Sequence, residues 1–213
     1  MINLFRRLKF IYDCDIQNGF INIKSGTKIN CSKSSSVSIK NGAFQFGYPL
    51  RFSCDYPSQN RGLIKLGNGS RLIVEGSVTL GPGSAIVLGE GAVLRFGGDN
   101  VFAHNTMIFC HKSVVFERGA AASWNCVFMD WDGHEFRRGQ GERQRVLKRP
   151  LLVGKNVGVQ MNVLVPRGVS IGDNSIVSAG TVLRKDVPSN TLVYSEQSYR
   201  MKNGYQSGIK KIN

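Results

Sequence analysis

Three histidines and a few nearby acids are the side chains best suited to proton transfer in this chain. His134 ends the motif Asp130-Trp131-Asp132-Gly133-His134. Its unperturbed pKa of about 6.5 suits a general base at neutral pH, although a lone histidine is more often structural. Asp130 or Asp132 could orient the imidazole or bind a substrate hydroxyl, or both acids could cap a turn. The motif therefore makes His134 the candidate base.

Thiol and metal chemistry are less favoured by the sequence. The five cysteines are odd in number and none has Cys-x-x-Cys spacing, which argues against a disulfide framework or a zinc ribbon. Reduced thiols in a cytosolic chain fit better. A covalent mechanism through Cys110 or Cys126 would need an activated thiolate, and no partner for one is evident. The three histidines lack the spacing of a metal site, so no metal is expected.

A six-residue repeat indicates the element that positions these residues. Residues 153–188 divide into the hexads VGKNVG, VQMNVL, VPRGVS, IGDNSI, VSAGTV and LRKDVP. The first position always holds a branched aliphatic residue, and glycine, asparagine or aspartate takes the corners. A helix cannot use this period, whereas short strands joined by regular turns can. We therefore expect stacked coils of a β-solenoid, with the first hexad position pointing inward.

The period continues upstream in a longer form. Leu66 to Leu88, Val74 to Phe96 and Leu80 to Phe102 are each 22 residues apart. We therefore expect an all-β, three-sided parallel β-helix over residues 21–190. Residues 131–150 are polar and basic and break the pattern, which predicts a loop that leaves one face and binds or catalyses.

The two ends differ from the repeat. Residues 1–20 interleave apolar with basic side chains and form either an interfacial membrane segment or an element packed on the domain. Residues 191–213 form a basic tail. The net charge of +14 points to an anionic partner, but the basic residues are dispersed and no nucleic-acid motif is present. No apolar run is long enough to span a membrane.

The hexads and the following GTVLRKDVP at 180–188 resemble the left-handed β-helix, or hexapeptide-repeat, acyltransferases. The stretch SWNCVFMDWDGHEF at 123–136 and the Gly-Glu-Arg at 141–143 resemble the branch that O-acetylates bacterial surface polysaccharides. This resemblance covers about residues 60–190. It departs at Gly158, where the family often has tryptophan, and at residues 195–198, where the family has a Gly-Asn-Pro-Ala cap.

The resemblance implies roles for particular residues. It implies an acceptor-binding asparagine at Asn105. Asn105 and Asn125 are 20 residues apart, close to one coil, and are therefore expected to stack on the same face. The alternative to acceptor binding is an internal asparagine ladder, in which stacked amides bond each other. Trp131 could stack on a sugar ring or cover the loop. For coenzyme A, the resemblance implies backbone amides at Ala179 and a basic pair. That pair consists of Arg184 and Lys185.

The predicted function is therefore direct transfer of acetyl from acetyl-CoA to a sugar hydroxyl, with His134 as general base. The acceptor would belong to a capsule, an O-antigen or an exopolysaccharide. A small-sugar acetyltransferase and a non-catalytic scaffold are the alternatives. The resemblance implies a homotrimer with active sites between subunits. We expect a cytoplasmic protein, either free or at the inner face of the plasma membrane.

Overall fold

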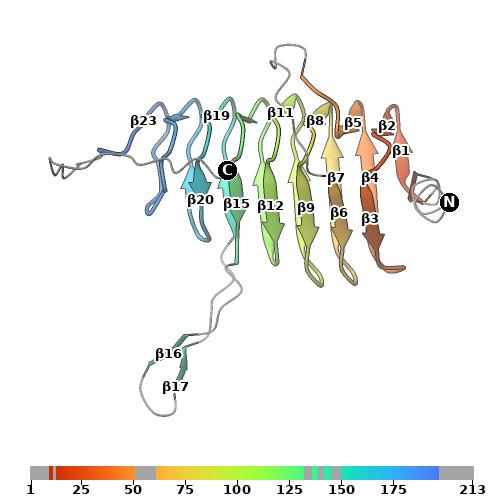
Figure 1. Cartoon of the computed structure of the whole chain (residues 1–213), viewed down its shortest axis with the longest axis horizontal. Helices are drawn as coiled ribbons and strands as arrows, with labels where there is room; N and C mark the ends of the chain where they lie inside the picture. Colours follow the sequence, from red (N-terminus) through yellow and green to blue (C-terminus); the bar gives the residue numbers. More distant parts are fainter. Residues whose placement is uncertain are drawn as a thin grey trace, which may run out of the picture.

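The structure is a computed structural model that describes residues 10–11, 13–50, 61–131 and 150–196, together with the backbone of two short strands at 136–138 and 142–144. The chain forms a left-handed parallel β-helix with three faces (Figure 1). The repeat predicts the stacked three-sided coils, and the family resemblance implies their left hand. Successive strands pass from the first sheet to the second and then to the third, so that three strands complete one coil. Within the described residues, no helix is long and apolar enough to cross a membrane.

The three faces are parallel sheets, named here A, B and C. Sheet A contains β1 (Asp15–Gln17), β4 (Ser36–Lys40), β7 (Arg71–Glu75), β10 (Val93–Phe96), β13 (Ser113–Phe116), β18 (Leu151–Val153) and β21 (Ser170–Ile171). Sheet B contains β2 (Phe20–Ile23), β5 (Ala43–Phe46), β8 (Val78–Leu80), β11 (Asn100–Phe102), β14 (Ala121–Ala122), β19 (Gly158–Val159), β22 (Ile176–Val177) and β23 (Leu192–Val193). Sheet C contains β3 (Lys28–Cys31), β6 (Leu63–Leu66), β9 (Ala85–Leu88), β12 (Met107–Cys110), β15 (Val127–Met129) and β20 (Leu164–Val165).

The register confirms the predicted repeat lengths. Leu66 pairs with Leu88, Val74 with Phe96 and Leu80 with Phe102, the three 22-residue steps seen in the sequence. Later coils are shorter. Val101 pairs with Ala121 after 20 residues, and Leu152 pairs with Ser170 after 18 residues, which is three hexads.

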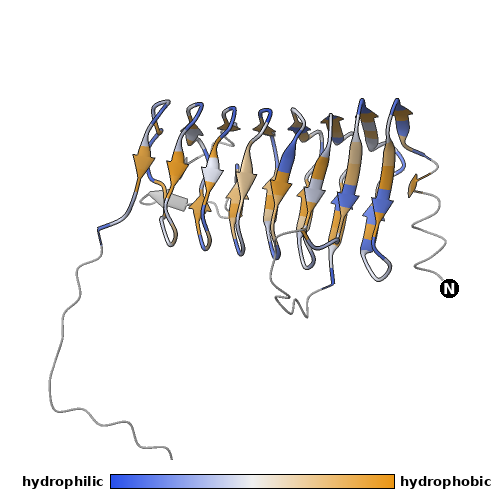
Figure 2. Cartoon of the chain, turned by 90° about the horizontal axis from the view of Figure 1, so that it is seen from above, coloured by the Kyte–Doolittle hydropathy of each residue, from blue (hydrophilic) through white to orange (hydrophobic). Residues whose placement is uncertain are grey.

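The core lies inside the coils because side chains alternate along each strand. Figure 2 shows polar residues between apolar ones along the strands nearest the N-terminus, whereas the strands of the later coils are mainly apolar. The first hexad position points inward, as predicted, and its six residues are at most 4% exposed: Val153, Val159, Val165, Ile171, Val177 and Leu183. In the middle coils the core is aromatic. The ring of Phe116 lies 5.4 Å from that of Phe96, 4.8 Å from Phe102 and 4.9 Å from Phe128.

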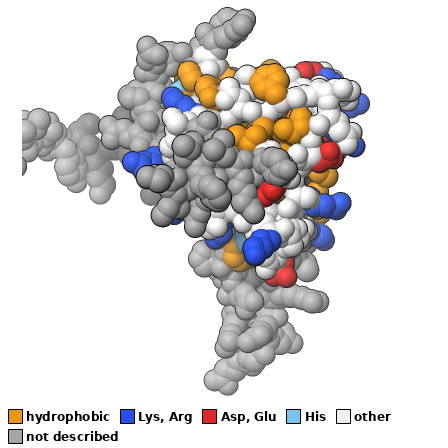
Figure 3. Space-filling model, turned by 90° about the vertical axis from the view of Figure 1, so that its right-hand side faces the viewer, with side chains coloured by type: hydrophobic (Ala, Val, Ile, Leu, Met, Phe, Trp, Pro, Cys, Tyr) orange, Lys and Arg blue, Asp and Glu red, His pale blue; other side chains and the backbone are white. Residues whose placement is uncertain are grey.

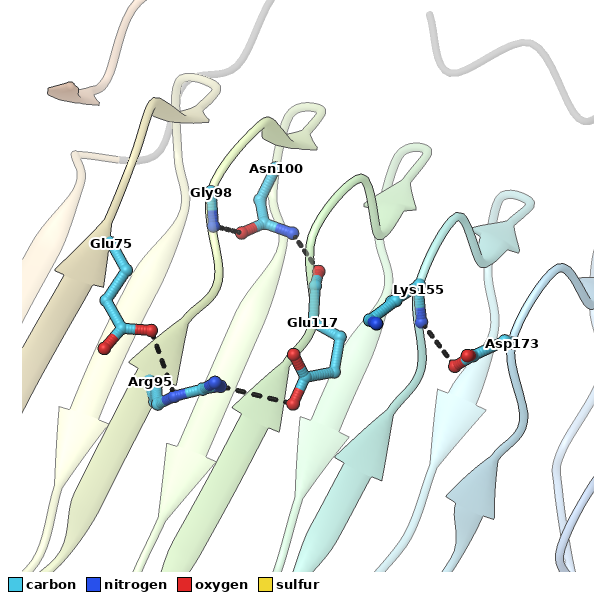
Figure 4. Close-up of polar contacts among 7 residues, drawn as sticks. All are labelled: Glu75, Arg95, Gly98, Asn100, Glu117, Lys155 and Asp173. Atoms are coloured by element: carbon cyan, nitrogen blue, oxygen red, sulfur yellow. Dashed lines mark hydrogen bonds and ion pairs between the residues drawn. The ribbon is translucent and has the colours of Figure 1, made fainter. Parts of the chain in front are cut away.

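Ion pairs cross the outer face of sheet A (Figure 4). The Arg95 guanidinium lies 3.3 Å from a Glu75 carboxylate oxygen and 3.2 Å from one of Glu117. These side chains are partly exposed, so each pair contributes about 1 kcal/mol or less. The buried side chain of Asn100 stabilises the neighbouring corner with two hydrogen bonds. Its amide oxygen accepts from the Gly98 N–H at 3.0 Å, and its amide nitrogen donates to the Glu117 carbonyl at 2.8 Å.

In the part of the chain that the structure describes, the longer connections between strands leave the solenoid at its corners. The chain leaves after β15 in sheet C and returns at β18 in sheet A, which places the 131–150 insertion at the corner between these two sheets. Strands β16 (Phe136–Arg138) and β17 (Glu142–Gln144) form an antiparallel hairpin within it. In Figure 1 this hairpin stands clear of the coils. A second segment, between β5 and β6, leaves at the corner between sheets B and C.

Replacing Phe116 by alanine should lower the free energy of unfolding by about 3–5 kcal/mol, because a fully buried ring that contacts three others is lost. Val115→Ala is the matched control, since Val115 neighbours Phe116 but points outward, and it should cost about 1 kcal/mol or less. Urea titration at a fixed protein concentration measures both variants. Equal losses would contradict the inward assignment of Phe116.

Candidate functional site

A groove of about 850 Å³ runs along the outer face of sheet B. Its floor consists of outward-facing residues from six successive coils: Gln45, Thr79, Val101, Ala121, Gly158 and Ile176. Pro49 and Leu50 line it as well, from the chain that follows β5. Residues at the corner between sheets B and C form its rim: Ser123, Trp124, Gln160, Met161 and Ala179. An open, mostly apolar groove with a few polar groups at one edge is typical of a ligand site.

Ala179, predicted to contact coenzyme A, lies in this groove and is exposed. Its backbone N–H donates to Oε1 of Gln160 at 3.0 Å. The predicted basic pair lies elsewhere. Arg184 and Lys185 are exposed and lie between two residues that belong to different sheets. Val182, before the pair, bridges to Leu164 of sheet C. Val187, after the pair, bridges to Ile171 of sheet A. The pair therefore lies at the corner between sheets C and A, away from the rim.

Asn105 and Asn125 stack at the corner between sheets B and C. The Asn105 side-chain amide donates to Asn125 at 3.1 Å, and Asn125 donates to Asn162 at 3.2 Å. All three residues have a φ close to +58°, a left-handed conformation that asparagine tolerates better than most residues. The structure thus contains the asparagine ladder given as the alternative for this pair. Acceptor binding by Asn105 stays a prediction, and the ladder places it close to the groove rim.

Asp130 is fully buried directly after β15. Its carboxylate accepts three backbone N–H bonds from the preceding coil, from His111 at 2.6 Å, Lys112 at 2.6 Å and Ser113 at 2.8 Å. This is the turn-capping arrangement, and it holds the corner from which the insertion leaves. Trp131, which follows, is half-buried with its ring 4.0 Å from the His111 ring. His134 and Asp132 lie outside the described residues.

Two further kinds of titratable group are buried in the coils. Burial raises the pKa of the Cys110 thiol, and the nearby Asp130 carboxylate raises it further. Burial also raises the pKa of Cys126, so both thiols are protonated at neutral pH and are poor nucleophiles. At His104 burial lowers the pKa, helped by the positive charge of Lys24, so the imidazole is neutral.

Ala179 was predicted from the sequence as a coenzyme A contact and Gly158 was named as a departure from the family, whereas the other outward residues of the groove were not predicted. Gln160 and Met161 belong to a predicted hexad, but nothing in the hexad distinguishes them. Alternation in the upstream strands could have marked Val101 as outward. In the view of the N-terminal end, lysine, arginine and acidic side chains are scattered over the described surface (Figure 3). In the described part of the chain, no three metal-ligating side chains gather.

A β-helix built from hexads, with an open groove on one face, defines the class of the hexapeptide-repeat solenoids. No family model matches the chain. It is 39% identical over 59 residues to the galactoside O-acetyltransferase of Escherichia coli, covering 28% of this chain and 27% of that protein. It is 26% identical over 106 residues to the galactoside O-acetyltransferase of Lactococcus lactis, covering 47% and 51%. The chain thus spans about half or less of these relatives. The predicted resemblance to the hexapeptide-repeat acyltransferases is confirmed by these relatives.

Two solved structures have a backbone similar to that of this chain. The polySia-specific acetyltransferase NeuO has a TM-score of 0.48 at 15% identity, over 93% of this chain and 82% of that one. The polysialic acid O-acetyltransferase OatWY has a TM-score of 0.44 at 17% identity, over 89% and 93%.

Replacing Asp130 by alanine should lower the free energy of unfolding by about 3 kcal/mol or more, because three backbone donors lose a charged acceptor inside the protein. Asp173→Ala is the matched control. Asp173 is a less buried corner acid that accepts the Lys155 N–H at 2.8 Å, and its loss should cost about 1 kcal/mol. Thermal and urea unfolding measure both variants. A stable Asp130→Ala protein without activity would instead assign this acid to the substrate.

Proposed function

We propose that this chain is an acetyl-CoA-dependent O-acetyltransferase that modifies a sugar hydroxyl during synthesis of a bacterial surface polysaccharide. The observation that carries the proposal is the similarity to proteins named galactoside O-acetyltransferases. The groove on sheet B supports it, because a long flexible co-substrate needs an extended surface with apolar floor and polar edge. The galactoside acceptors in the names of these relatives support a sugar hydroxyl as the acceptor.

In the proposed reaction, His134 takes the proton of the attacking hydroxyl. The oxygen then attacks the thioester carbonyl, the new C–O bond forms, and the C–S bond breaks. Coenzyme A leaves as a thiol after protonation. Direct transfer is favoured over an acyl-cysteine intermediate because Cys110 and Cys126 are buried and have raised pKa values.

The groove rim offers the donor a backbone hydrogen-bond site. The Ala179 N–H is occupied by the exposed Gln160 side chain, which can swing away at little cost. A carbonyl of the pantetheine arm would replace Gln160 Oε1 as acceptor. Arg184 and Lys185, at a different corner, would bind the phosphates of coenzyme A.

The separation of these groups favours an oligomer. In a three-sided solenoid, the corner between sheets C and A lies opposite the face formed by sheet B. The point at which the insertion leaves, after Asp130 and Trp131, therefore lies across the solenoid from the groove of the same chain, as do Arg184 and Lys185. In the proposed homotrimer, the insertion of one chain faces the groove of the next. Closed rotational symmetry then repeats the same site three times.

The acceptor separates this proposal from its main alternative. The insertion carries many basic residues, including Arg137, Arg138, Arg143 and Arg145, which suits an acidic glycan or a phosphate-linked precursor. A small free sugar is the alternative, favoured by the galactoside acceptors of the relatives. A cytoplasmic location belongs to the same proposal, in agreement with cysteines that are free thiols wherever the structure describes them.

The purified chain should consume acetyl-CoA faster with de-O-acetylated polysaccharide or its lipid-linked unit than with simple galactosides. His134→Ala should lower this turnover by about a hundred- to ten-thousand-fold, because the general base is lost. Affinity for coenzyme A should change little. Thiol release measures turnover, and calorimetry measures coenzyme A binding.

Arg184→Ala is the contrasting variant. It should raise KM for acetyl-CoA more than it lowers kcat, since it affects binding and not proton transfer. Normal turnover by His134→Ala would remove His134 from the mechanism. A clear preference for simple galactosides would favour the small-sugar alternative.

Two inactive variants should restore each other when they share a trimer. His134→Ala removes the base, and Ala179→Trp fills the groove. A mixed trimer contains sites in which the insertion comes from the Ala179→Trp chain and the groove from the His134→Ala chain. Each trimer that contains both variants has one complete site of three, so the purified mixed trimers should return about a third of wild-type activity. Co-expression with two different tags and tandem purification provides the mixed sample.

Mixing the two variants only after each has assembled is the control. If co-expressed variants stay as inactive as the separate ones, base and groove belong to the same chain. Light scattering of the wild-type chain checks the oligomeric state independently.

A further inference from the structure

The corner between sheets C and A changes its residues at the coil from which the insertion leaves. The pairings within sheet C define which residue takes the same corner position in successive coils. In four of these coils the position is held by Gly67, Gly89, His111 and Trp131. The first two residues have no side chain, whereas the two nearest the insertion have aromatic rings. The change therefore coincides with the start of the insertion.

The two rings are stacked on the backbone of this corner. A Cβ added to Gly89 would lie 2.5 Å from Nδ1 of the His111 ring, so the imidazole occupies the space that a side chain at Gly89 would need. The centroid of the Trp131 ring lies 4.0 Å from that of His111, with the ring planes inclined by 43°. Neighbouring coils are about 4.8 Å apart, so the rings continue the spacing of the coils outside the sheet. His111 therefore connects Trp131 to the preceding coils.

Trp131 fixes the chain one residue beyond the backbone anchor at Asp130. The Asp130 N–H donates to the Phe109 carbonyl at 3.2 Å, and its carboxylate accepts the three N–H bonds described above. A chain held at Asp130 alone is free to rotate about the φ and ψ of the next residue. The stacked ring of Trp131 removes that freedom. Two consecutive fixed residues set the direction in which the insertion starts.

That direction matters for the candidate base. His134 follows Trp131 by three residues, so at most about 11 Å of extended chain separates their Cα atoms. A displaced Trp131 would move this short segment relative to the groove of the neighbouring chain. A catalytic group displaced by about 1 Å loses up to about a hundredfold in rate.

We propose that His111 is a positioning residue of the acetyl transfer. Its ring, seated over Gly89, docks Trp131 and thereby directs the insertion that bears His134. The inference rests on the proposed function and leaves its reaction unchanged. The acetyl group still passes directly from coenzyme A to the sugar hydroxyl, and His111 transfers no proton.

Two other roles of Trp131 make different predictions. If its ring stacks on the acceptor sugar, Trp131→Ala raises the KM of the acceptor and His111→Ala does not. If the ring only covers the corner, both variants lower stability and leave kcat unchanged. In the proposed role both variants lower kcat. They leave the KM of acetyl-CoA nearly unchanged, because the proposed donor contacts lie in the groove and at Arg184 and Lys185.

The kinetic test uses the full chain, acetyl-CoA and the acceptor that the wild type uses best. His111→Ala should lower kcat by about ten- to a hundredfold. His111→Phe, which keeps a flat ring over Gly89, should retain at least about half of the wild-type kcat. Gly89→Ala keeps both rings but displaces the imidazole, and it should lower kcat in the same direction. Lys112→Ala is the matched control, since this exposed neighbour keeps its backbone N–H bond to Asp130, and it should retain the wild-type kcat.

Fluorescence reports the contact without turnover. The chain has two tryptophans, so Trp124→Phe leaves Trp131 as the only one. In this background His111→Ala should raise the quenching of Trp131 by acrylamide about twofold or more, because an aromatic pair is worth about two- to tenfold in the docked population. His111→Ala and Trp131→Ala remove the same contact. The double variant should therefore lose no more kcat than either single variant.

The inference is overturned by a normal kcat in His111→Ala, by unchanged quenching of Trp131, or by losses that multiply in the double variant. It is also overturned if His111→Phe is as slow as His111→Ala, because the imidazole itself is then required. In each of these cases a wild type that transfers acetyl groups leaves the proposed function standing. If the wild type transfers no acetyl group, the proposed function fails and this inference fails with it.

Discussion

Parallel stacking of coils in register governs the whole molecule. Each strand takes its hydrogen bonds from the coil before and the coil after, so each inward position lies directly above another inward position. One such column in sheet C runs through Ile64, Ile86, Ile108 and Phe128, and all four are fully buried. A change of one residue in register would move every apolar side chain of a strand to the outside. The inner face is therefore strictly constrained, and the outer face is not.

The same constraint explains why added segments occur at corners. Val114 pairs with Leu151 after 37 residues, yet the register on both sides of the insertion is continuous. A segment that left from the middle of a strand would interrupt the hydrogen bonds of two neighbouring coils. The corners themselves need support, because the chain turns sharply there and exposes backbone donors. Asp130 supplies it at one corner, and the ladder of Asn105, Asn125 and Asn162 supplies it at another.

How far the sequence predicts this structure depends on which side of the strand a residue faces. Inward residues such as Leu66, Leu88 and Val153 repeat visibly, so the fold and the 22-residue steps could be predicted. The groove floor could not, because outward residues contact solvent or a ligand and need not repeat. The stacking of Asn105 on Asn125 follows from their 20-residue spacing, whereas Asn162 is hidden by the insertion, which lengthens the step to 37 residues. The three donors around Asp130 come from another coil, and no local motif shows them.

The candidate residues of one chain divide into two half-sites on opposite sides of the solenoid. Ala179 and the groove belong to sheet B and its rim, whereas Arg184, Lys185 and the start of the insertion belong to the opposite corner. A rigid β-helix cannot bend to bring a face and its opposite corner together, because that would break the coil-to-coil hydrogen bonds. In the proposed reaction, the groove of one chain is therefore combined with the insertion of a neighbouring chain, and the three-sided cross-section is the physical reason for that proposal.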